Sequence, residues 1–260
     1  MPPAPLLRRA ARPLRSPGPK PRRSRPPTWS SDETVQRVRA RAPATTRVVA
    51  YHHRVSFAVV LSEALDSPPG PAAACARAVA TFDQRGCVSP QCVFVEADFE
   101  RAAVFAEALC DALALEEAAR PRGPLPPAAA SELHQARGAA ELRAAAGEPV
   151  RVLPETVEAW TVVVDEAPPE LVGLSERFVR VVPVEGPDQV VGRLRPLARH
   201  LQTVAVAGSP ARRDALAGRL GAIGASRVTT LERAPWPPAW WHHDGFGPLE
   251  VLVRWTDLEG

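Results

Sequence analysis

Residues 82–96 read FDQRGCVSPQCVFVE, and they carry the most information in this chain. The first ten of these residues are polar and turn-forming, whereas Cys92-Val93-Phe94-Val95-Glu96 is an apolar run typical of a buried strand. Cys87 lies in the loop, where its sulfur can be reached from solvent. Gly86 precedes it and lets the backbone approach a substrate closely. A thiol in a loop just before a buried strand is one way in which an α/β enzyme presents a nucleophile.

The composition allows one large domain or two small ones. The chain has 260 residues, of which 45% are hydrophobic and only 5% aromatic, so Ala, Val and Leu must build the core. Residues 1–28 hold eight basic residues, nine prolines and no acid, while the remainder has 24 basic and 29 acidic residues. The net charge of +3 therefore belongs to a tail, and the folded part gives no reason to expect a nucleic-acid partner.

Residues 1–28 are predicted to be disordered, because they cannot bury enough apolar surface to offset the entropy of ordering. They contain no apolar segment typical of a leader peptide, and no run in the chain approaches the 18 apolar residues of a membrane span. The cysteine spacings of 12, 5 and 18 match no common zinc pattern, so no metal is expected. These features predict free thiols and a cytoplasmic location.

The rest of the chain alternates between helical and strand-like segments, which predicts an α/β fold. The segment over 98–115 has apolar residues at 99, 102, 105, 109 and 113, a helical rhythm. Pro196 is expected to end or kink the helix before it. We expect helices over 34–41, 72–83, 98–115, 131–146, 188–193 and 212–220, and strands over 47–50, 56–61, 92–96, 160–164, 178–184, 203–207 and 227–230.

Four segments, in this order along the chain, resemble the acyl-CoA reductase family. These are the LuxC-type fatty acid reductases of bioluminescence, relatives of the aldehyde dehydrogenases. The segments are Ser31-Asp32-Glu33-Thr34-Val35, His53-Arg54-Val55-Ser56-Phe57-Ala58-Val59-Val60, Gly86-Cys87-Val88-Ser89-Pro90-Gln91, and Trp241-His242-His243-Asp244-Gly245 with Gly247-Pro248-Leu249.

The resemblance covers residues 29–260 and implies an α/β fold: an aldehyde-dehydrogenase-like catalytic domain with a remnant of the dinucleotide-binding domain. On this basis, residues 1–28 are a tail and residues 29–60 the remnant. Residues 61–230 are the catalytic domain, and residues 231–260 pack at the domain interface.

The resemblance also implies an oxidoreductase that forms a thioester intermediate. Fatty acyl-CoA, or an acyl-carrying partner subunit, would transfer its acyl group to Cys87, and NADPH would reduce the thioester to a fatty aldehyde. The thiol would need a lowered pKa, for which Arg85 or a helix N-terminus is a candidate, although Arg85 can also simply face solvent. The backbone N–H of Cys87 is the first candidate to stabilise the oxyanion.

Other residues carry weaker expectations. Ser31 matches a cofactor-binding position of the family, and His53 matches a family histidine with either a substrate or cofactor contact or a structural role. His242, His243 and Asp244 resemble metal ligands, but neighbouring residues of a strand point to opposite faces, so we assign them no metal. Three tryptophans are expected to anchor the C-terminal segment: Trp236, Trp240 and Trp241.

The chain departs from the family before Trp29. Family members are usually nearly twice as long, and the additional half contributes most of the dinucleotide-binding domain. No glycine-rich turn joins a strand to a helix here, and Ser30 replaces a family glycine. Two hypotheses follow: an NADPH-dependent acyl-CoA reductase, or a truncated acyl-binding or partner-binding module that reduces nothing. A homo-oligomer is expected from the resemblance alone.

Overall fold

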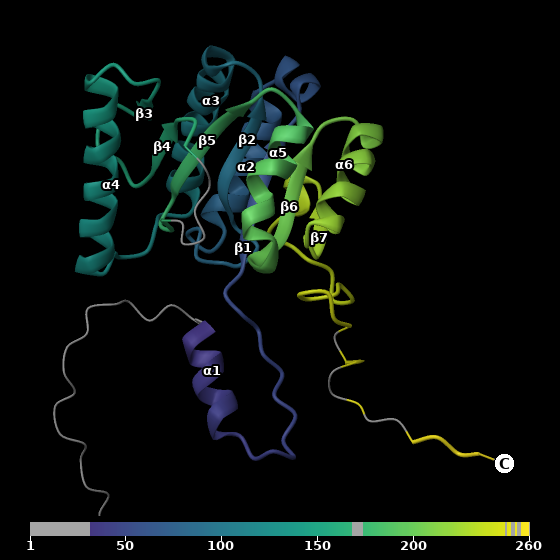
Figure 1. The fold of residues 1–260 in the computed structure, drawn as a ribbon. Coiled ribbons are helices and arrows are strands. Elements are labelled where there is room, and N and C mark those ends of the chain that lie inside the picture. The colour runs from purple at the N-terminus through teal and green to yellow at the C-terminus, as the bar shows by residue number, and fades with distance from the viewer. Residues whose placement is uncertain (1–31, 168–173, 248, 251–252, 254–255, 260) are drawn as a thin grey trace, which may run out of the picture.

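A seven-stranded sheet with helices on both faces forms the body of the protein, as a computed structural model shows (Figure 1). The structure describes residues 32–259 except 168–173, 248, 251–252 and 254–255. The predicted tail over 1–28 and the candidate cofactor residue Ser31 lie outside the described residues. Within the described parts of the chain, none of the helices combines the length and the apolarity that crossing a bilayer demands.

The sheet has the strand order β3-β4-β5-β2-β1-β6-β7, and its only antiparallel pair is β3 with β4. Its central strands are runs of Val, Ala and Phe that are buried on both faces, as expected for a parallel sheet. The strands are β1 (Val55–Val60), β2 (Pro90–Glu96), β3 (Arg151–Leu153), β4 (Thr161–Val164), β5 (Phe178–Val184), β6 (Leu201–Ala207) and β7 (Arg227–Thr229).

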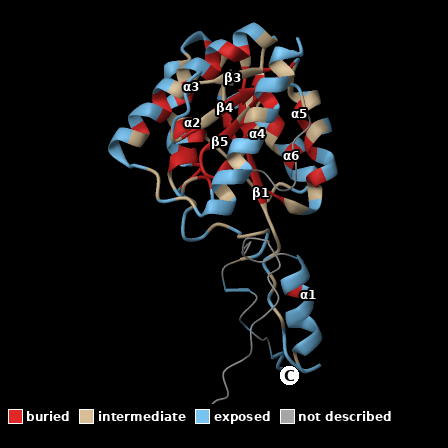
Figure 2. Ribbon diagram, turned by 90° about the vertical axis from the view of Figure 1, so that its left-hand side faces the viewer, coloured by how far each residue is buried: buried red, intermediate tan, exposed pale blue. Residues whose placement is uncertain are grey.

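Helices cover both faces of this sheet. α2 (Pro69–Ala80) and α3 (Phe99–Ala119) pack on one face, and α5 (Pro187–Leu194) and α6 (Pro210–Ala222) pack on the other. α4 (Pro127–Ala145) covers the end of the second face at β4. Figure 2 shows most of the buried residues gathered in these layers, while α1 (Asp32–Arg41), exposed except at Val35, lies apart from the sheet. The short 3₁₀ helices are η1 (Ser62–Asp66), η2 (Arg195–His200) and η3 (Leu231–Arg233).

Most of the expected elements are confirmed. The strand predicted over 178–184 has the observed bounds of β5, and the helix predicted over 98–115 is α3. Asp98 caps α3 by accepting a 2.8 Å hydrogen bond from the backbone N–H of Arg101. The helix at 188–193 gives way to a 3₁₀ helix around Pro196, as the proline predicts.

Three expectations about the elements are wrong. Residues 47–50 form no strand, and Val49 is exposed, because none of the strands in the described part of the chain pairs with this segment. The helix predicted over 72–83 ends at Ala80, since the next residues adopt left-handed backbone conformations. β3 was not predicted, because a three-residue edge strand carries almost no sequence pattern.

β1 lies within the sheet, because it pairs with β2 on one side and β6 on the other. The first strand of the sheet begins at Val55. The expected domain boundaries stay predictions.

Candidate functional site

Cys87 lies at the amino edge of the sheet, three residues before β2 begins. Of the four cysteines, all free, Cys87 is exposed, whereas Cys75 and Cys92 are buried. The amino ends of β1 and β6 meet at the same edge, because Val55 pairs in register with Leu201. The residue is thus exposed, and the accessibility of its sulfur and its catalytic role stay predictions.

The loop that carries Cys87 is tied to both neighbouring strands through Ser56. The Ser56 hydroxyl donates a 2.5 Å hydrogen bond to the carbonyl oxygen of Cys87. The Ser56 hydroxyl oxygen in turn accepts a 3.1 Å hydrogen bond from the backbone N–H of Thr203 on β6. One buried hydroxyl therefore fixes the Cys87 backbone relative to β1 and β6.

Polar side chains gather beside the Cys87 sulfur. Gln202 on β6 is completely buried and interacts with the thiol through its side-chain amide. Its Nε2 donates a 2.8 Å hydrogen bond to Oδ1 of Asp244, and Nε of Arg54 lies 3.2 Å from the same carboxylate oxygen. The other oxygens, Oε1 of Gln202 and Oδ2 of Asp244, are buried and have no hydrogen-bond partner among the described residues. The site thus offers two acceptors near the sulfur.

These surroundings raise the pKa of the Cys87 thiol above its ordinary value. Although Cys87 is exposed as a residue, desolvation of its thiol by the groups packed around it is the largest cause, and the negative charge of Asp244 adds to it. The amide of Gln202 and the backbone N–H groups of Cys87 and Val88 act in the opposite direction, because they stabilise the thiolate. The sequence-based expectation of a lowered pKa is wrong for this structure, and the thiol is mostly protonated at pH 7.

Arg85 does not act on the thiol. Its Nε and Nη2 donate hydrogen bonds of 2.7 and 2.8 Å to the two carboxylate oxygens of Glu176, a fork-to-fork ion pair. Arg85 is therefore not the cation that activates Cys87, and its side chain, 48% exposed, faces solvent as the alternative expectation had it while pairing with Glu176. The pairing was not visible in the sequence, because the two residues are 91 positions apart.

Gly86 is required by the loop itself. A Cβ atom at this position would lie 3.0 Å from the Phe82 ring and 3.1 Å from the Ser89 hydroxyl. The space that a side chain would occupy is thus filled by the loop's own residues. The prediction that Gly86 admits a substrate is not tested by this packing.

His53 lies beside His200 in the segment that leads into β1. Nδ1 of His200 is 3.0 Å from the carbonyl oxygen of His53, and the two rings are 6.4 Å apart. Burial, and then the neighbouring His200, lower the pKa of His53, while Asp32 opposes them. His53 is therefore neutral at pH 7, and the contacts of the described residues favour its structural role.

The C-terminal segment reaches the site through His243 and Asp244. The His243 ring lies between those of Tyr51 and Trp241, with centroids 4.7 and 4.8 Å away. Trp241 is also covered by the Arg227 guanidinium at 5.6 Å. The expected anchoring role of the other two tryptophans is wrong, because both are exposed: Trp236 and Trp240. Among the described residues, no three His, Cys, Asp or Glu side chains group as metal ligands.

The sequence did not single out Ser56, Gln202 or Arg54 as site residues. Each lies at or just before the start of a strand, and only the pairing of β1 with β2 and β6 brings them to Cys87. A single sequence does not contain this strand order. Arg54, Ser56 and Asp244 stand in the family-like segments, which could have directed attention to them, whereas Gln202 does not.

An apolar cavity of about 210 Å³ lies between α4 and the sheet. Phe57 and Cys92 line its side toward β1 and β2, and the ion pairs of Asp165 with Arg143 and Arg180 lie at its polar end. Cys87 is not among the lining residues. The cavity is therefore a feature separate from the thiol site.

Comparison with solved structures places the fold among the aldehyde dehydrogenases. An NADP-dependent glyceraldehyde-3-phosphate dehydrogenase from Bacillus halodurans is 14% identical, with a TM-score of 0.66, and the match covers 86% of this chain and 49% of that one. A salicylaldehyde dehydrogenase from Pseudomonas putida is 13% identical, with a TM-score of 0.61 and the same coverage. A NAD-dependent benzaldehyde dehydrogenase from Corynebacterium glutamicum is 19% identical, with a TM-score of 0.55, over 80% of this chain and 47% of that one.

These likenesses show the fold, and the chain spans about half the length of each of these three proteins. Residues 27–255 match the LuxC acyl-CoA reductases, so the chain belongs to that family, as its four segments predicted. No curated protein sequence matched the chain.

Proposed function

We propose that Cys87 accepts the acyl group of a fatty acyl-CoA, or of an acyl-carrying partner subunit, in a reductase that forms fatty aldehyde. The observation that supports this most is the exposed thiol at the amino edge of the sheet, surrounded by buried polar groups, in a chain of the acyl-CoA reductase family. Its exposure distinguishes Cys87 from the buried Cys75 and Cys92.

In the first step the Cys87 sulfur attacks the carbonyl carbon of the acyl-CoA thioester. A new carbon–sulfur bond forms, the bond to the CoA sulfur breaks, and CoA leaves as a thiolate. Because the Cys87 pKa is raised, the thiol must lose its proton as it attacks. Oδ2 of Asp244 has no hydrogen-bond partner among the described residues and serves as the proton acceptor, while Oδ1 is held by Gln202 and Arg54. The backbone N–H of Cys87 stabilises the oxyanion.

The described residues fit the reacting end of a nicotinamide cofactor better than its diphosphate. The unpartnered acceptor Oε1 of Gln202 suits an N–H donor of a carboxamide, while Oδ2 of Asp244 is left for the thiol proton. The chain has no glycine-rich turn between a strand and a helix to cradle a diphosphate. When bound, NADPH supplies the hydride that converts the thioester to aldehyde.

Mass spectrometry of the intact protein tests the acyl transfer. Incubation with dodecanoyl-CoA should add one dodecanoyl group to the wild-type chain, and peptide mapping should place it on Cys87. Cys87→Ala should abolish the addition, whereas Cys110→Ala, a change at a partly buried cysteine on α3, should leave it intact. Addition of NADPH should then release dodecanal. Acylation that persists in Cys87→Ala would contradict the proposal.

The cavity under α4 favours a second candidate function, the binding of an acyl chain without chemistry. It is apolar along most of its wall and separate from Cys87. If this is the function, Cys87→Ala should keep its affinity for a fluorescent fatty acid. Ala136→Phe, which fills the cavity, should lose that affinity, while Ala128→Phe on the exposed side of the same helix should not. Binding that survives Ala136→Phe would rule this function out.

A further inference from the structure

The loop that carries Cys87 begins in an unfavourable backbone conformation. Phe82, Asp83 and Gln84 have φ angles of +103°, +48° and +61°, in the left-handed region that side chains other than glycine rarely adopt. A second segment of this kind is hydrogen-bonded to the first: its residues Glu176 and Arg177 have φ angles of +68° and +65°. Conformations of this kind persist only where the surrounding structure imposes them, and they cluster at functional sites.

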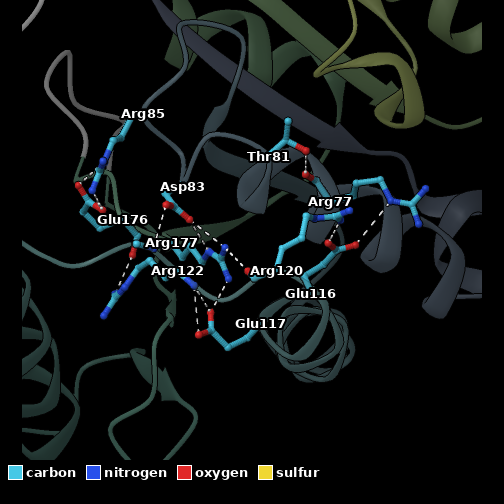
Figure 3. A network of polar contacts seen from close by, with 11 residues as sticks. Arg77, Thr81, Asp83, Arg85, Glu116, Glu117, Arg120, Arg122, Glu176 and Arg177 are labelled. Carbon is cyan, nitrogen blue, oxygen red and sulfur yellow. Dashed lines mark hydrogen bonds and ion pairs between the residues drawn. The ribbon is translucent and has the colours of Figure 1, made fainter.

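Asp83 holds the two segments together. Its carbonyl oxygen accepts a 2.9 Å hydrogen bond from the backbone N–H of Glu176. Its Oδ1 accepts a 3.0 Å hydrogen bond from Nε of Arg177 and lies 2.8 Å from Nη2 of the same guanidinium. Oδ2 accepts a 3.3 Å hydrogen bond from the backbone N–H of Gly123. Both carboxylate oxygens and the carbonyl are thus occupied in fixing this turn (Figure 3).

Arg177 connects this turn to the C-terminal end of α3. Its side chain is only 1% exposed, and it is the largest of the fully buried side chains. Nη1 donates a 2.5 Å hydrogen bond to Glu117, and Nη2 donates one of 2.8 Å to the carbonyl oxygen of Arg120. Figure 3 shows the guanidinium between Asp83 and these groups. A buried cation with two carboxylate partners is held in one geometry, so the Arg177 guanidinium keeps the Asp83 carboxylate in one position.

The remainder of the loop is fixed at both ends. Nε2 of the buried Gln84 donates a 3.0 Å hydrogen bond to the carbonyl oxygen of Pro90. Nε2 of Gln91 donates one of 3.0 Å to the carbonyl oxygen of Gln84. Arg85 adds its double hydrogen bond to Glu176. Cys87 therefore lies in a short span between anchored residues.

We propose that Asp83 and Arg177 are positioning residues for Cys87: their ion pair imposes the left-handed turn that fixes the position of the Cys87 backbone. The inference rests on the proposed function of Cys87 as the acyl acceptor. It assigns neither residue a contact with substrate. Its consequence is that loss of the pair changes the ionisation and the acyl transfer of Cys87 without removing the thiol.

The first measurement is the rate at which iodoacetamide alkylates Cys87 as a function of pH, followed by mass spectrometry. Arg177→Met and Asp83→Asn should move the midpoint of this profile upward by at least about 0.5 pH unit, because the N–H groups that stabilise the thiolate are displaced. Arg177→Lys keeps the charge without the planar fork and should restore part of the shift. Asp83→Asn keeps the side-chain shape, so the test stands even if Arg177→Met fails to fold.

Arg137→Met is the matched control. Arg137 is also buried, at 6% side-chain exposure, and donates hydrogen bonds to Glu141 and to the carbonyl oxygens of Pro154 and Glu155. Its loss should destabilise the fold and leave the pH midpoint of Cys87 unchanged. A merely structural role for Arg177 would give the same result as this control, and an unchanged midpoint in both Arg177→Met and Asp83→Asn would overturn the inference.

The second measurement is acyl transfer from dodecanoyl-CoA. Arg177→Met and Asp83→Asn should lower its maximal rate at least about tenfold, with half-saturation within about threefold of wild type, because the nucleophile and not the binding surface is misplaced. If the wild-type chain accepts no acyl group, the proposed function fails, while the pH profile still decides whether the pair positions Cys87. If wild type is acylated and the variants keep its maximal rate, the positioning role fails alone.

Discussion

The Ser56 hydroxyl and the Cys87 carbonyl oxygen are joined by a 2.5 Å hydrogen bond across 31 positions of sequence. Because the same hydroxyl accepts a hydrogen bond from Thr203, three segments of the chain meet at one buried atom. The backbone of the nucleophile loop is thus held from the side of β1 and β6, while the Asp83–Arg177 pair holds it from the side of β5. The Cys87 backbone is thus supported from two sides.

We predict that Ser56→Ala destabilises the protein and disturbs the site together. The change leaves the Thr203 N–H and the Cys87 carbonyl without a buried partner, which costs about 1–3 kcal/mol. Urea unfolding followed by circular dichroism measures this loss. Ser131→Ala removes an exposed hydroxyl on α4 and should change the stability by less than about 0.5 kcal/mol. Equal stabilities of the two variants would show that the Ser56 contact contributes nothing.

Alkylation of the native chain should be selective for Cys87. Its rate should keep rising at pH values at which the rate of an ordinary thiol has become constant. Burial raises the pKa values of Cys75, Cys92 and Cys110 to about 12, so these thiols are almost entirely protonated below pH 9. The pKa of Cys87 is also raised, and since the thiolate is the reactive form, its rate should still be climbing where a free cysteine has levelled off. Timed iodoacetamide labelling and peptide mapping check both points. A plateau below pH 8 would contradict the raised pKa.

The sequence was sufficient to predict most of the layers of the fold. β5 and α3 each carry a pattern that is complete within one segment: a β-branched run for β5, and for α3 a capping aspartate with helical apolar spacing. The loop around Cys87 was identified for the same reason, since its polar residues and the apolar strand behind it are contiguous. Local patterns of this kind need no knowledge of the partner strands.

The surroundings of the thiol could not be predicted in this way. Gln202 reaches Cys87 only because β6 lies beside β1, and Asp244 arrives from the C-terminal segment. The direction of the Cys87 pKa shift depends on these distant groups and on burial, so the family-based expectation of an activated thiol had the wrong sign. The pairing of Arg85 with Glu176 could not be predicted either, because the two residues are 91 positions apart.

Ion pairs at the opposite edge of the sheet, where the parallel strands have their carboxyl ends, should make the free energy of unfolding depend on pH. Arg212 donates hydrogen bonds to Glu63 at 2.5 Å and to Glu96 at 2.6 Å, and the backbone N–H of Ser209 donates one of 2.8 Å to Glu63. Burial raises the pKa of Glu63, but the Ser209 and Arg212 contacts outweigh it and lower that pKa from 4.5 to about 2. A lowered folded-state pKa stabilises the protein fully above pH 4.5, and this contribution is lost as the pH falls toward 2.

Arg212→Met should therefore lower the urea midpoint more at pH 7 than at pH 3. Arg219→Met provides the comparison, because Arg219 pairs with Asp188 on the surface, where both side chains are largely exposed. An exposed pair of this kind contributes little, so this variant should behave like wild type at both pH values. A penalty for Arg212→Met that stays constant from pH 7 to pH 3 would exclude the proposed ionic contribution.

Asp244→Asn should have opposite effects on two reactions of the same sulfur. Removing the negative charge lowers the pKa of Cys87, so more thiolate is present below that pKa. Each unit of lowering increases the thiolate about tenfold and decreases its intrinsic nucleophilicity about threefold, so iodoacetamide alkylation at pH 7 should rise about threefold per unit. Acyl transfer from dodecanoyl-CoA should instead fall about 100-fold, because an amide cannot accept the thiol proton as a general base does.

Both rates can be measured on one preparation by intact-protein mass spectrometry, with Asp214→Asn, an exposed change on α6, as the control that should alter neither. A parallel change of alkylation and acylation in Asp244→Asn would mean that Asp244 only tunes the thiol charge and takes no proton. Divergent changes would make Asp244 the base, because a purely electrostatic neighbour must move every reaction of the thiolate in one direction.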